Sequence, residues 1–416
     1  MNSSLDTERK AASTESDDAL EALMGFGVLM WRSGNTAIRT RDCMELMARK
    51  VGFDAIAISL SLDSITASVR HSRKLITVMR VIGPPGINAS RIGELEELAR
   101  SGERCTTSRD IAARLAEIGS TPPLYSSTQI AGAIGLASGG LAFLNGAGAP
   151  EVIAAATGGA MGQCLRLWLS HRQLNQYGTA ALSAMLAAGV YVLAATLANS
   201  VGVEFTRYPA GFIASVLFLV PGFPLIAALF DLLHYQTVAA LSRFAYGVMI
   251  LLAVAFGLSL VIEIADVDLS RQPPIELVYP LKLALRATAS FVAGCGFAIS
   301  FNSTTRTVLA AGFFALGAND LRLVLTDMGL MLAPAAFLGA LATGLVALVA
   351  DRHFKVPPMA TTVAPIVIMI PGLYAFEMIV LLNRGQVLEA LQAAALFGFV
   401  IGALAMGLAV ARLFSR

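Results

Sequence analysis

The 416-residue chain is poor in charged residues, in cysteine and in histidine. Charged residues make up 14% of it, against about 25% in an ordinary soluble domain. The four cysteines stand singly without a CxxC pair, and the four histidines form no HExxH motif, so the sequence argues against a disulfide framework and a zinc site. A net charge of +2 without a long run of Lys and Arg argues against nucleic acid as the main partner. We therefore expect no metal and no cofactor.

Apolar side chains dominate the rest of the composition. Hydrophobic residues make up 56% of the chain and the mean hydropathy is +0.70, values typical of an integral membrane protein. Of the 58 charged residues, 32 lie in residues 1–120. The sequence therefore predicts an all-α polytopic membrane protein that carries a soluble α+β domain at its N-terminus.

The N-terminal region is expected to hold a disordered lead and one cytoplasmic domain. Residues 1–17 are polar and carry no aromatic side chain, which favours disorder. The N-terminus has no apolar core followed by a cleavage site, so we do not expect a secretory signal. Over residues 18–120 the periodicity predicts helices at 18–30, 36–51, 88–101 and 108–118, and strands at 55–62, 64–69 and 75–82.

The remainder of the chain is expected to cross the membrane ten times. A span needs about 20 mostly apolar residues. Ten stretches qualify: 124–145, 149–169, 178–200, 208–230, 240–264, 277–300, 305–320, 323–350, 358–382 and 387–412. An even number places both termini on one side, and a slight excess of Lys and Arg on that side predicts that it is the cytoplasm.

The spans contain an internal repeat. Shifted by 156 residues, Gly140-Leu-Ala matches Gly296-Phe-Ala and Leu165-Arg-Leu matches Leu321-Arg-Leu, while Val220-Pro-Gly matches Ile370-Pro-Gly at a shift of 150. The matches divide the spans into two modules of five, residues 121–270 and 271–416. Because five is odd, the second module must enter the membrane the opposite way up, as in the inverted repeats of many secondary transporters.

A Pro-Gly pair lies in the fourth span of each module. Proline removes a helical N–H and glycine lets the backbone turn, so Pro221-Gly222 and Pro371-Gly372 should break their helices. A broken helix in lipid must turn its free backbone groups toward a cavity or a neighbouring helix. We expect the two breaks to form a substrate site, although a kink within a packed helix is the structural alternative.

An ordered set of motifs runs from about Leu20 to Arg412. In the first part they are Leu23-Met-Gly-Phe-Gly-Val-Leu-Met-Trp-Arg-Ser-Gly34, Arg80-Val-Ile-Gly-Pro-Pro-Gly-Ile-Asn88 and Val220-Pro-Gly-Phe-Pro224. In the second part they are Gly296-Phe-Ala-Ile-Ser-Phe-Asn302, Val356-Pro-Pro and Ile370-Pro-Gly372. No single motif is specific, but the set in this order resembles the threonine/serine exporter family.

The resemblance implies a cytoplasmic domain, ten membrane helices, and export of small hydroxy amino acids across the bacterial inner membrane in antiport with protons. After Asp231-Leu-Leu the family usually has a Gly-Asp pair, where this chain has His234-Tyr-Gln. Relatives with separate modules are associated with dicarboxylate export, so succinate is an alternative substrate. A homo-oligomer is compatible with this organisation.

Three charged residues near the breaks are candidates for coupling. Glu377 lies six residues beyond Pro371, about 9 Å along a helix, and is the best candidate to carry a proton. The alternative is a structural acid paired with a neighbouring span. Asp231 lies about 15 Å beyond Pro221, where a gate or capping salt bridge with Arg243 is expected.

Other polar residues give weaker signals. Lys282 and Arg286 share a helix face that could hold a carboxylate, or they could extend to the interface. Asn302 could bind substrate or cap a helix, and the stretch from Asp320 to Asp327 is expected to be a solvated connection.

Three other classes of protein compete with a transporter. No GxSxG motif or deep His-Ser pair points to an enzyme, and one chain with two inverted halves is a poor basis for a ring-lined channel. A membrane-anchored sensor remains an alternative, in which the soluble domain would be the active part.

Overall fold

The computed structural model describes most of the chain, namely residues 2–71, 74–83, 86–100, 107–205, 208–267, 277–354 and 358–414. The chain divides into two compact units. The head unit comprises residues 1–123 together with 230–243, and the membrane unit comprises 124–229 together with 244–416. The short segment 230–243 therefore belongs with the soluble domain, although the chain on either side of it is membrane helix.

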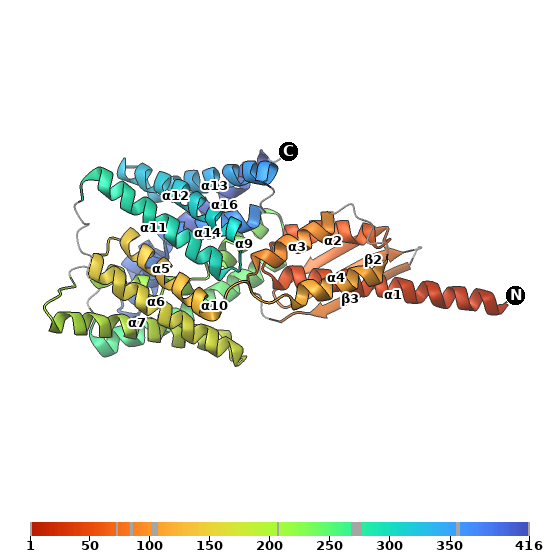
Figure 1. Ribbon diagram of the computed structural model, residues 1–416, viewed down its shortest axis with the longest axis horizontal. Coiled ribbons are helices and arrows are strands. Elements are labelled where there is room, and N and C mark those ends of the chain that lie inside the picture. The colour runs from red at the N-terminus through yellow and green to blue at the C-terminus, as the bar shows by residue number, and fades with distance from the viewer. Residues whose placement is uncertain are drawn as a thin grey trace. The chain divides into compact units, whose positions relative to one another are not determined.

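The head unit is an α+β domain, as the sequence predicted. Its elements are α1 (Asn2–Arg32), α2 (Ala37–Lys50), β1 (Ala55–Leu60), β2 (Ser64–His71), β3 (Lys74–Val81), α3 (Ala89–Arg100) and α4 (Ser108–Ser120) (Figure 1). The strands form one antiparallel sheet in the order β1-β2-β3. Alternate residues Ile65, Ala67 and Val69 of β2 are fully buried in a core shared with the helices. Helix α1 also covers the lead for which the sequence predicted disorder.

The membrane unit consists of helices at all ten predicted positions. These are α5 (Ser127–Leu144), α6 (Ala149–His171), α7 (Gln176–Ser200), α8 (Tyr208–Ala214) with η1 (Leu217–Leu219) and α9 (Gly222–Leu233), α10 (Thr237–Ala265), α11 (Tyr279–Ser300), α12 (Thr305–Asp327), α13 (Leu332–Phe354), α14 (Pro358–Met369) with α15 (Gly372–Asn383), and α16 (Val387–Leu413). Helices α5, α6 and α7 lie side by side, as do α11, α12 and α13, and α5 packs on α11 (Figure 1).

Nine of the ten predicted segments are long and apolar enough to span a membrane. Within the described part of the chain, seven single helices meet this test, and two bent pairs raise the number to nine if each pair is one span. The segment outside this set is α6, in which Gln163 and Arg166 lower the mean hydropathy. The chain is therefore a multi-pass membrane protein.

The two bent pairs are the segments with a predicted Pro-Gly break. The chain turns by 61° between Pro209–Leu219 and Gly222–Leu233, and by 43° between Thr361–Met369 and Gly372–Asn383. Both breaks have the same local geometry, because Gly222 N donates to Val220 O (2.7 Å) and Gly372 N donates to Ile370 O (2.8 Å). The prediction that both helices break is confirmed, since a proline N cannot continue the helical hydrogen-bond pattern.

Close helix contacts at glycine recur in the two modules. On α5, a Cβ built on Gly140 would lie 2.9 Å from Ala289 O of α11, and on α11, a Cβ built on Gly296 would lie 2.5 Å from Ala133 O of α5. Gly296 is the counterpart of Gly140, and Ala289 is the counterpart of Ala133, at the same shift of 156 residues as the sequence matches. The glycine and the carbonyl group that it approaches are therefore exchanged between α5 and α11. Only glycine permits such an approach of two backbones, so these contacts fix the packing of α5 on α11.

A second glycine contact recurs between other helices. A Cβ on Gly257 of α10 would overlap Ala181 O of α7, and one on Gly407 of α16 would lie 2.5 Å from Phe337 O of α13. The glycines differ by 150 residues and their partners by 156. The third helix of each module thus packs on the fifth in the same way.

Candidate functional site

The two Pro-Gly breaks pack against each other. A Cβ built on Gly222 would overlap Ile370 Cδ1, and one built on Gly372 would lie 2.7 Å from Leu217 Cδ2 and 3.2 Å from Val220 Cγ2. The contact is reciprocal, because Val220 and Ile370 hold equivalent positions before the two prolines. The structure thus brings Pro221, Gly222, Pro371 and Gly372 to one place, as the sequence predicted.

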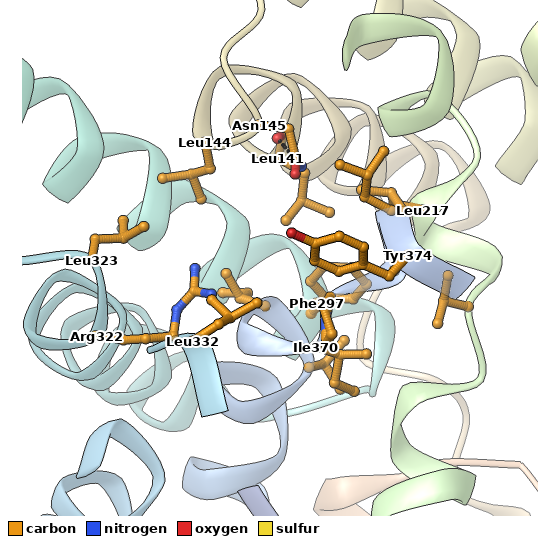
Figure 2. Close-up of a pocket in the computed structure, with 16 residues that line it drawn as sticks. Leu141, Leu144, Asn145, Leu217, Phe297, Arg322, Leu323, Leu332, Ile370 and Tyr374 are labelled. Carbon is orange, nitrogen blue, oxygen red and sulfur yellow. Dashed lines mark hydrogen bonds between the residues drawn. The ribbon is translucent and has the colours of Figure 1, made fainter. Parts of the chain in front are cut away.

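A cavity of about 190 Å³ opens beside these breaks. Apolar side chains form most of its wall, and three polar side chains, Asn145, Arg322 and Tyr374, interrupt it (Figure 2). The break of the second module contributes seven of the sixteen lining residues, more than any other segment. The lining residues are Leu141, Leu144, Asn145, Leu217, Val220, Phe297, Arg322, Leu323, Leu332, Val367, Ile368, Ile370, Pro371, Gly372, Leu373 and Tyr374.

Arg322 of α12 is the one cationic side chain among these lining residues, and it points into the cavity (Figure 2). Its Nε donates to Asn319 Oδ1 (3.0 Å), and Asn319 Nδ2 donates to Ser290 Oγ (2.8 Å). Ser290 Oγ in turn donates to Asp320 Oδ1 (3.2 Å). Because Asn319 and Ser290 are fully buried, this chain of hydrogen bonds fixes the guanidinium through Nε and leaves its two terminal nitrogens to face the cavity.

Asn145 and Tyr374 face the same space from α5 and α15 (Figure 2). Asn145 Nδ2 donates to Leu141 O (2.7 Å), so its side-chain oxygen is directed to accept a hydrogen bond. Tyr374 lies in the first turn of α15, and its hydroxyl points toward Leu141 and Asn145. The cavity therefore offers a cation, an amide oxygen and a hydroxyl in an apolar wall, which suits a small polar solute.

Glu377, the predicted proton carrier, lies on α15 outside the lining of this cavity. It is half-buried and follows Tyr374 by three residues, so the two side chains share a face of the helix.

Asp231 and Arg243 form the predicted salt bridge, within the head unit. Arg243 Nη1 lies 3.2 Å from Asp231 Oδ2, and both side chains are buried. Ala37 N donates to Asp231 Oδ1 (2.8 Å), so the carboxylate caps the N-terminus of α2. Arg243 donates to Asn35 O, and its guanidinium lies 4.0 Å from the centre of the Trp31 ring. The pair therefore joins 230–243 to the N-terminal domain, and the Leu23–Gly34 motif contributes Trp31.

Lys282 and Arg286 share a face of α11, as predicted, but both form ion pairs with the carboxylate of Asp327 in the same chain. Lys282 Nζ lies 3.2 Å from Asp327 Oδ1, and Arg286 Nη1 lies 2.5 Å from Asp327 Oδ2. Neither residue lines the cavity described above. Asn302 has a left-handed backbone (φ 54°), and its Oδ1 accepts from Leu124 N (2.8 Å), which favours a capping role over substrate binding.

The sequence reasoning missed the three polar residues of the cavity. The expectation of a solvated connection from Asp320 to Asp327 is wrong for its first part, because Asp320 is 9% exposed and Arg322 lines the cavity. The signal for Arg322 was its place in the repeated Leu-Arg-Leu motif, and that for Tyr374 was its position two residues after Pro-Gly. Among the residues that the structure describes, no group of three His, Cys, Asp or Glu could hold a metal ion.

Comparison with known proteins supports a relation over both modules. One family profile, described as "Putative threonine/serine exporter", matches residues 21–265, and a second, described as "Threonine/Serine exporter, ThrE", matches residues 286–414. A protein of Corynebacterium glutamicum named threonine/serine exporter is 24% identical over 362 residues, which cover 85% of this chain and 73% of that protein.

Two further relatives differ in the share of the chain that they match. The probable threonine/serine exporter of Mycobacterium tuberculosis is 23% identical over 336 residues, 77% of this chain and 61% of its own. The probable succinate transporter subunit YjjP of Escherichia coli is 23% identical over 242 residues, 57% of this chain and 91% of its own. No solved structure matches. The chain therefore belongs to the threonine/serine exporter family of membrane transporters, in a form that carries both modules on one polypeptide.

Proposed function

We propose that this chain exports small amino acids of the threonine and serine type, in antiport with protons, by alternating access at the cavity between the two Pro-Gly breaks. The observation that carries the proposal is the reciprocal packing of the breaks beside a cavity with one cationic side chain in its lining. A break is a place where half of a helix can change direction without disturbing a continuous hydrogen-bond ladder.

An inverted repeat of two five-helix modules is part of the proposal. Two reciprocal contacts support it. Gly140 packs on Ala289, while its counterpart Gly296 packs on Ala133, the counterpart of Ala289. In the same way Gly222 packs on Ile370, and Gly372 packs on Val220. Such exchange of roles is characteristic of two units related by a twofold axis. Alternating access then follows if one module rocks against the other around the shared site.

The polar groups of the cavity favour an amino acid over a dicarboxylate. The carboxylate of an amino acid can bind the terminal nitrogens of Arg322. Its ammonium group needs acceptors, which Asn145 Oδ1, the Tyr374 hydroxyl and backbone carbonyls at the break can supply. Succinate would place a second carboxylate in a lining that holds no second cation. A cavity of about 190 Å³ has room for a small metabolite, since one water takes roughly 30 Å³ of liquid.

Proton coupling would require an acid whose exposure changes during the cycle. Glu377 fits this role from its place on α15, one helical turn beyond Tyr374. The proposal also places the protein in the bacterial inner membrane, with the soluble domain and the C-terminus in the cytoplasm. This orientation follows from the even number of predicted spans and the slight excess of positive charge on that side.

The proposal is tested in proteoliposomes loaded with radiolabelled threonine, serine or succinate. An imposed pH gradient should accelerate release of threonine and serine from vesicles with the wild-type protein, and Arg322→Gln should slow this release at threonine concentrations that do not saturate the site. Faster release of succinate than of either amino acid would instead support a dicarboxylate exporter. Release of none of the three would favour the membrane-anchored sensor.

A further inference from the structure

Arg166 of α6 is the first-module counterpart of Arg322, but the two side chains are in different states. Arg322 is anchored through Asn319. Arg166 is exposed, and within the described part of the chain no hydrogen bond or ion pair engages its guanidinium group. Because an arginine carries five N–H donors and is costly to place in a membrane helix, this lack of acceptors calls for a physical reason.

Three buried side-chain oxygens of the same module have no hydrogen-bond partner among the described residues. They are Gln163 Oε1 on α6, and Thr179 Oγ1 and Ser183 Oγ on α7. Their residues are 3%, 6% and 0% exposed, respectively. A buried acceptor without a partner destabilises the state in which it occurs. One module therefore holds both unused acceptors and an arginine with unused donors.

The repeat relates these acceptors to the surroundings of Arg322. At the shift of 156 residues Gln163 corresponds to Asn319, and each amide precedes its arginine by three residues. In the second module Asn319 Oδ1 accepts from Arg322 Nε (3.0 Å). Ser183 corresponds to Gly339, where a Cβ would lie 3.5 Å from Arg322 Cβ. The equivalent of Gln163 thus binds the arginine, and the equivalent of Ser183 contacts it.

The packing of α6 on α7 supports this equivalence. A Cβ built on Gly162 would lie 3.0 Å from Ser183 O, and one built on Gly339 would lie 3.0 Å from Ala318 O. Gly162 corresponds to Ala318 as Ser183 corresponds to Gly339, so the same two positions meet in both modules. The α6–α7 pair is therefore built like the α12–α13 pair that holds Arg322.

The acceptors and the arginine lie at neighbouring levels of the helix pair. Gln163 precedes Arg166 by less than one turn. Because a short connection joins α6 to α7, the two helices run antiparallel, and Thr179 lies about one turn nearer to this connection than Ser183. Arg166 is displaced from Gln163 in the same direction, so a guanidinium that turns inward at this level would meet the acceptors.

Extension of Arg166 to the membrane surface is the alternative explanation of its exposure, since long basic side chains often reach the interface. It accounts for the arginine in this state. It leaves the three buried acceptors without a role, although each of them is costly.

We propose that Gln163, Ser183 and Thr179 receive the Arg166 guanidinium in the opposite state of the transport cycle. If the two modules exchange conformations, the cavity opens to the other side of the membrane and Arg166 acquires the anchor that Arg322 has here. The donors and the acceptors are then satisfied together, which stabilises that state. This inference rests on the proposed alternating access, and it names residues that set the balance between the two states.

The test measures exchange of internal for external threonine in proteoliposomes without a pH gradient. Arg166→Gln loses hydrogen bonds of a charged group in the opposite state only. The maximal exchange rate should therefore fall about tenfold, while the half-saturating concentration stays near the wild-type value. Gln163→Leu should slow exchange likewise, and Gln163→Asn, which installs the second module's amide, should retain most of the rate. Arg172→Gln, which removes a charge from the same end of α6, is the matched control and should leave the rate unchanged.

Thermal unfolding separates this role from a purely structural one. Because Gln163 Oε1 is unsatisfied in this state, Gln163→Leu should keep or raise the unfolding temperature in detergent while it slows exchange. A residue needed only for packing would lower both. The double variant Arg166→Gln with Gln163→Leu should be no slower than either single variant, because both changes remove the same bond.

Each result bears on one claim. Unchanged exchange in Arg166→Gln, or equal slowing in Arg172→Gln, overturns this inference alone. A half-saturating concentration that rises in Arg166→Gln as in Arg322→Gln would make Arg166 a substrate ligand and also overturn it, as would a double variant whose slowing is the product of the two single effects. Wild-type protein that exchanges no threonine overturns the proposed function as a whole. Should Gln163→Leu fail to fold, Arg166→Gln and Arg172→Gln still decide, because both positions are exposed.

Discussion

The two membrane modules agree in the residues that shape the backbone and differ in those that carry charge. Both have a Pro-Gly break in the fourth span and glycines at equivalent helix contacts. By contrast, Arg322 lines the cavity while its counterpart Arg166 is exposed on α6, and Glu151 corresponds to Thr307.

The difference separates two kinds of constraint. A glycine at a close backbone approach and a proline at a break are needed wherever the same helices pack, so packing preserves them in both modules. A charge that binds one solute is needed only once, because the two modules share one site. We infer that function resides at charged positions whose surroundings, or whose charge, differ between the two modules.

The largest effect is expected at the buried ion pair of the head unit. Asp231 and Arg243 correspond by the shift of 150 to Leu381 and Ala393. Asp231→Ala leaves Arg243 buried without its partner and should destabilise the head by about 3 to 5 kcal/mol. The double variant Asp231→Leu with Arg243→Ala places the second module's residues at both positions, and it should recover most of this lost stability. Thermal unfolding and limited proteolysis of the purified full chain measure the stability of the head. A double variant that loses as much stability as the two single variants together would contradict the account.

The next effect is expected at the two arginines. Arg322→Gln removes a charge-assisted hydrogen bond to the substrate carboxylate, a loss of about 1.5 to 3 kcal/mol in binding. The half-saturating threonine concentration of Arg322→Gln should therefore be about tenfold higher or more, and that of Arg166→Gln should stay near the wild-type value. Equal effects of the two variants would mean that the cavity is not the binding site.

The two break glycines should respond alike. Gly222→Ala and Gly372→Ala each insert a methyl group against the opposite break, and such overpacking costs about 1 to 3 kcal/mol. Both should lower the unfolding temperature in detergent by similar amounts. A large effect at one glycine with none at the other would break the equivalence of the modules.

The smallest effect is expected at Asn302, which corresponds to Gly146. Both residues have positive φ, 54° and 93° respectively. Asn302→Ala loses the hydrogen bond to Leu124 N in a backbone conformation unfavourable to alanine, a loss of about 1 kcal/mol. Asn302→Gly, which installs the first module's residue, should cost only a few tenths of that by the same measurement. Impaired threonine binding in a stable Asn302→Gly protein would restore the predicted substrate role.

The sequence was sufficient to predict the positions of the membrane-unit helices, the two breaks and the head, because these depend on periodicity and on proline and glycine. It could not place Arg322 or Asn145 at the cavity, since that depends on how α5 and α12 pack across the modules. From the sequence, Lys282 and Arg286 could hold a substrate carboxylate, because the ion pair that they form with Asp327 on another helix is not visible in it. Local patterns predict elements, whereas a site assembled from distant helices requires their packing.

The most direct test of the central claim is a disulfide between the two breaks. In a cysteine-free background, Leu217→Cys and Gly372→Cys should form a disulfide under mild oxidation in membranes, because a Cβ on Gly372 lies 2.7 Å from Leu217 Cδ2. Oxidation should stop threonine release and a reductant should restore it, while Leu217→Cys with the exposed Phe399→Cys should not cross-link. A folded double variant that never forms the disulfide would contradict the claim that the two broken helices meet.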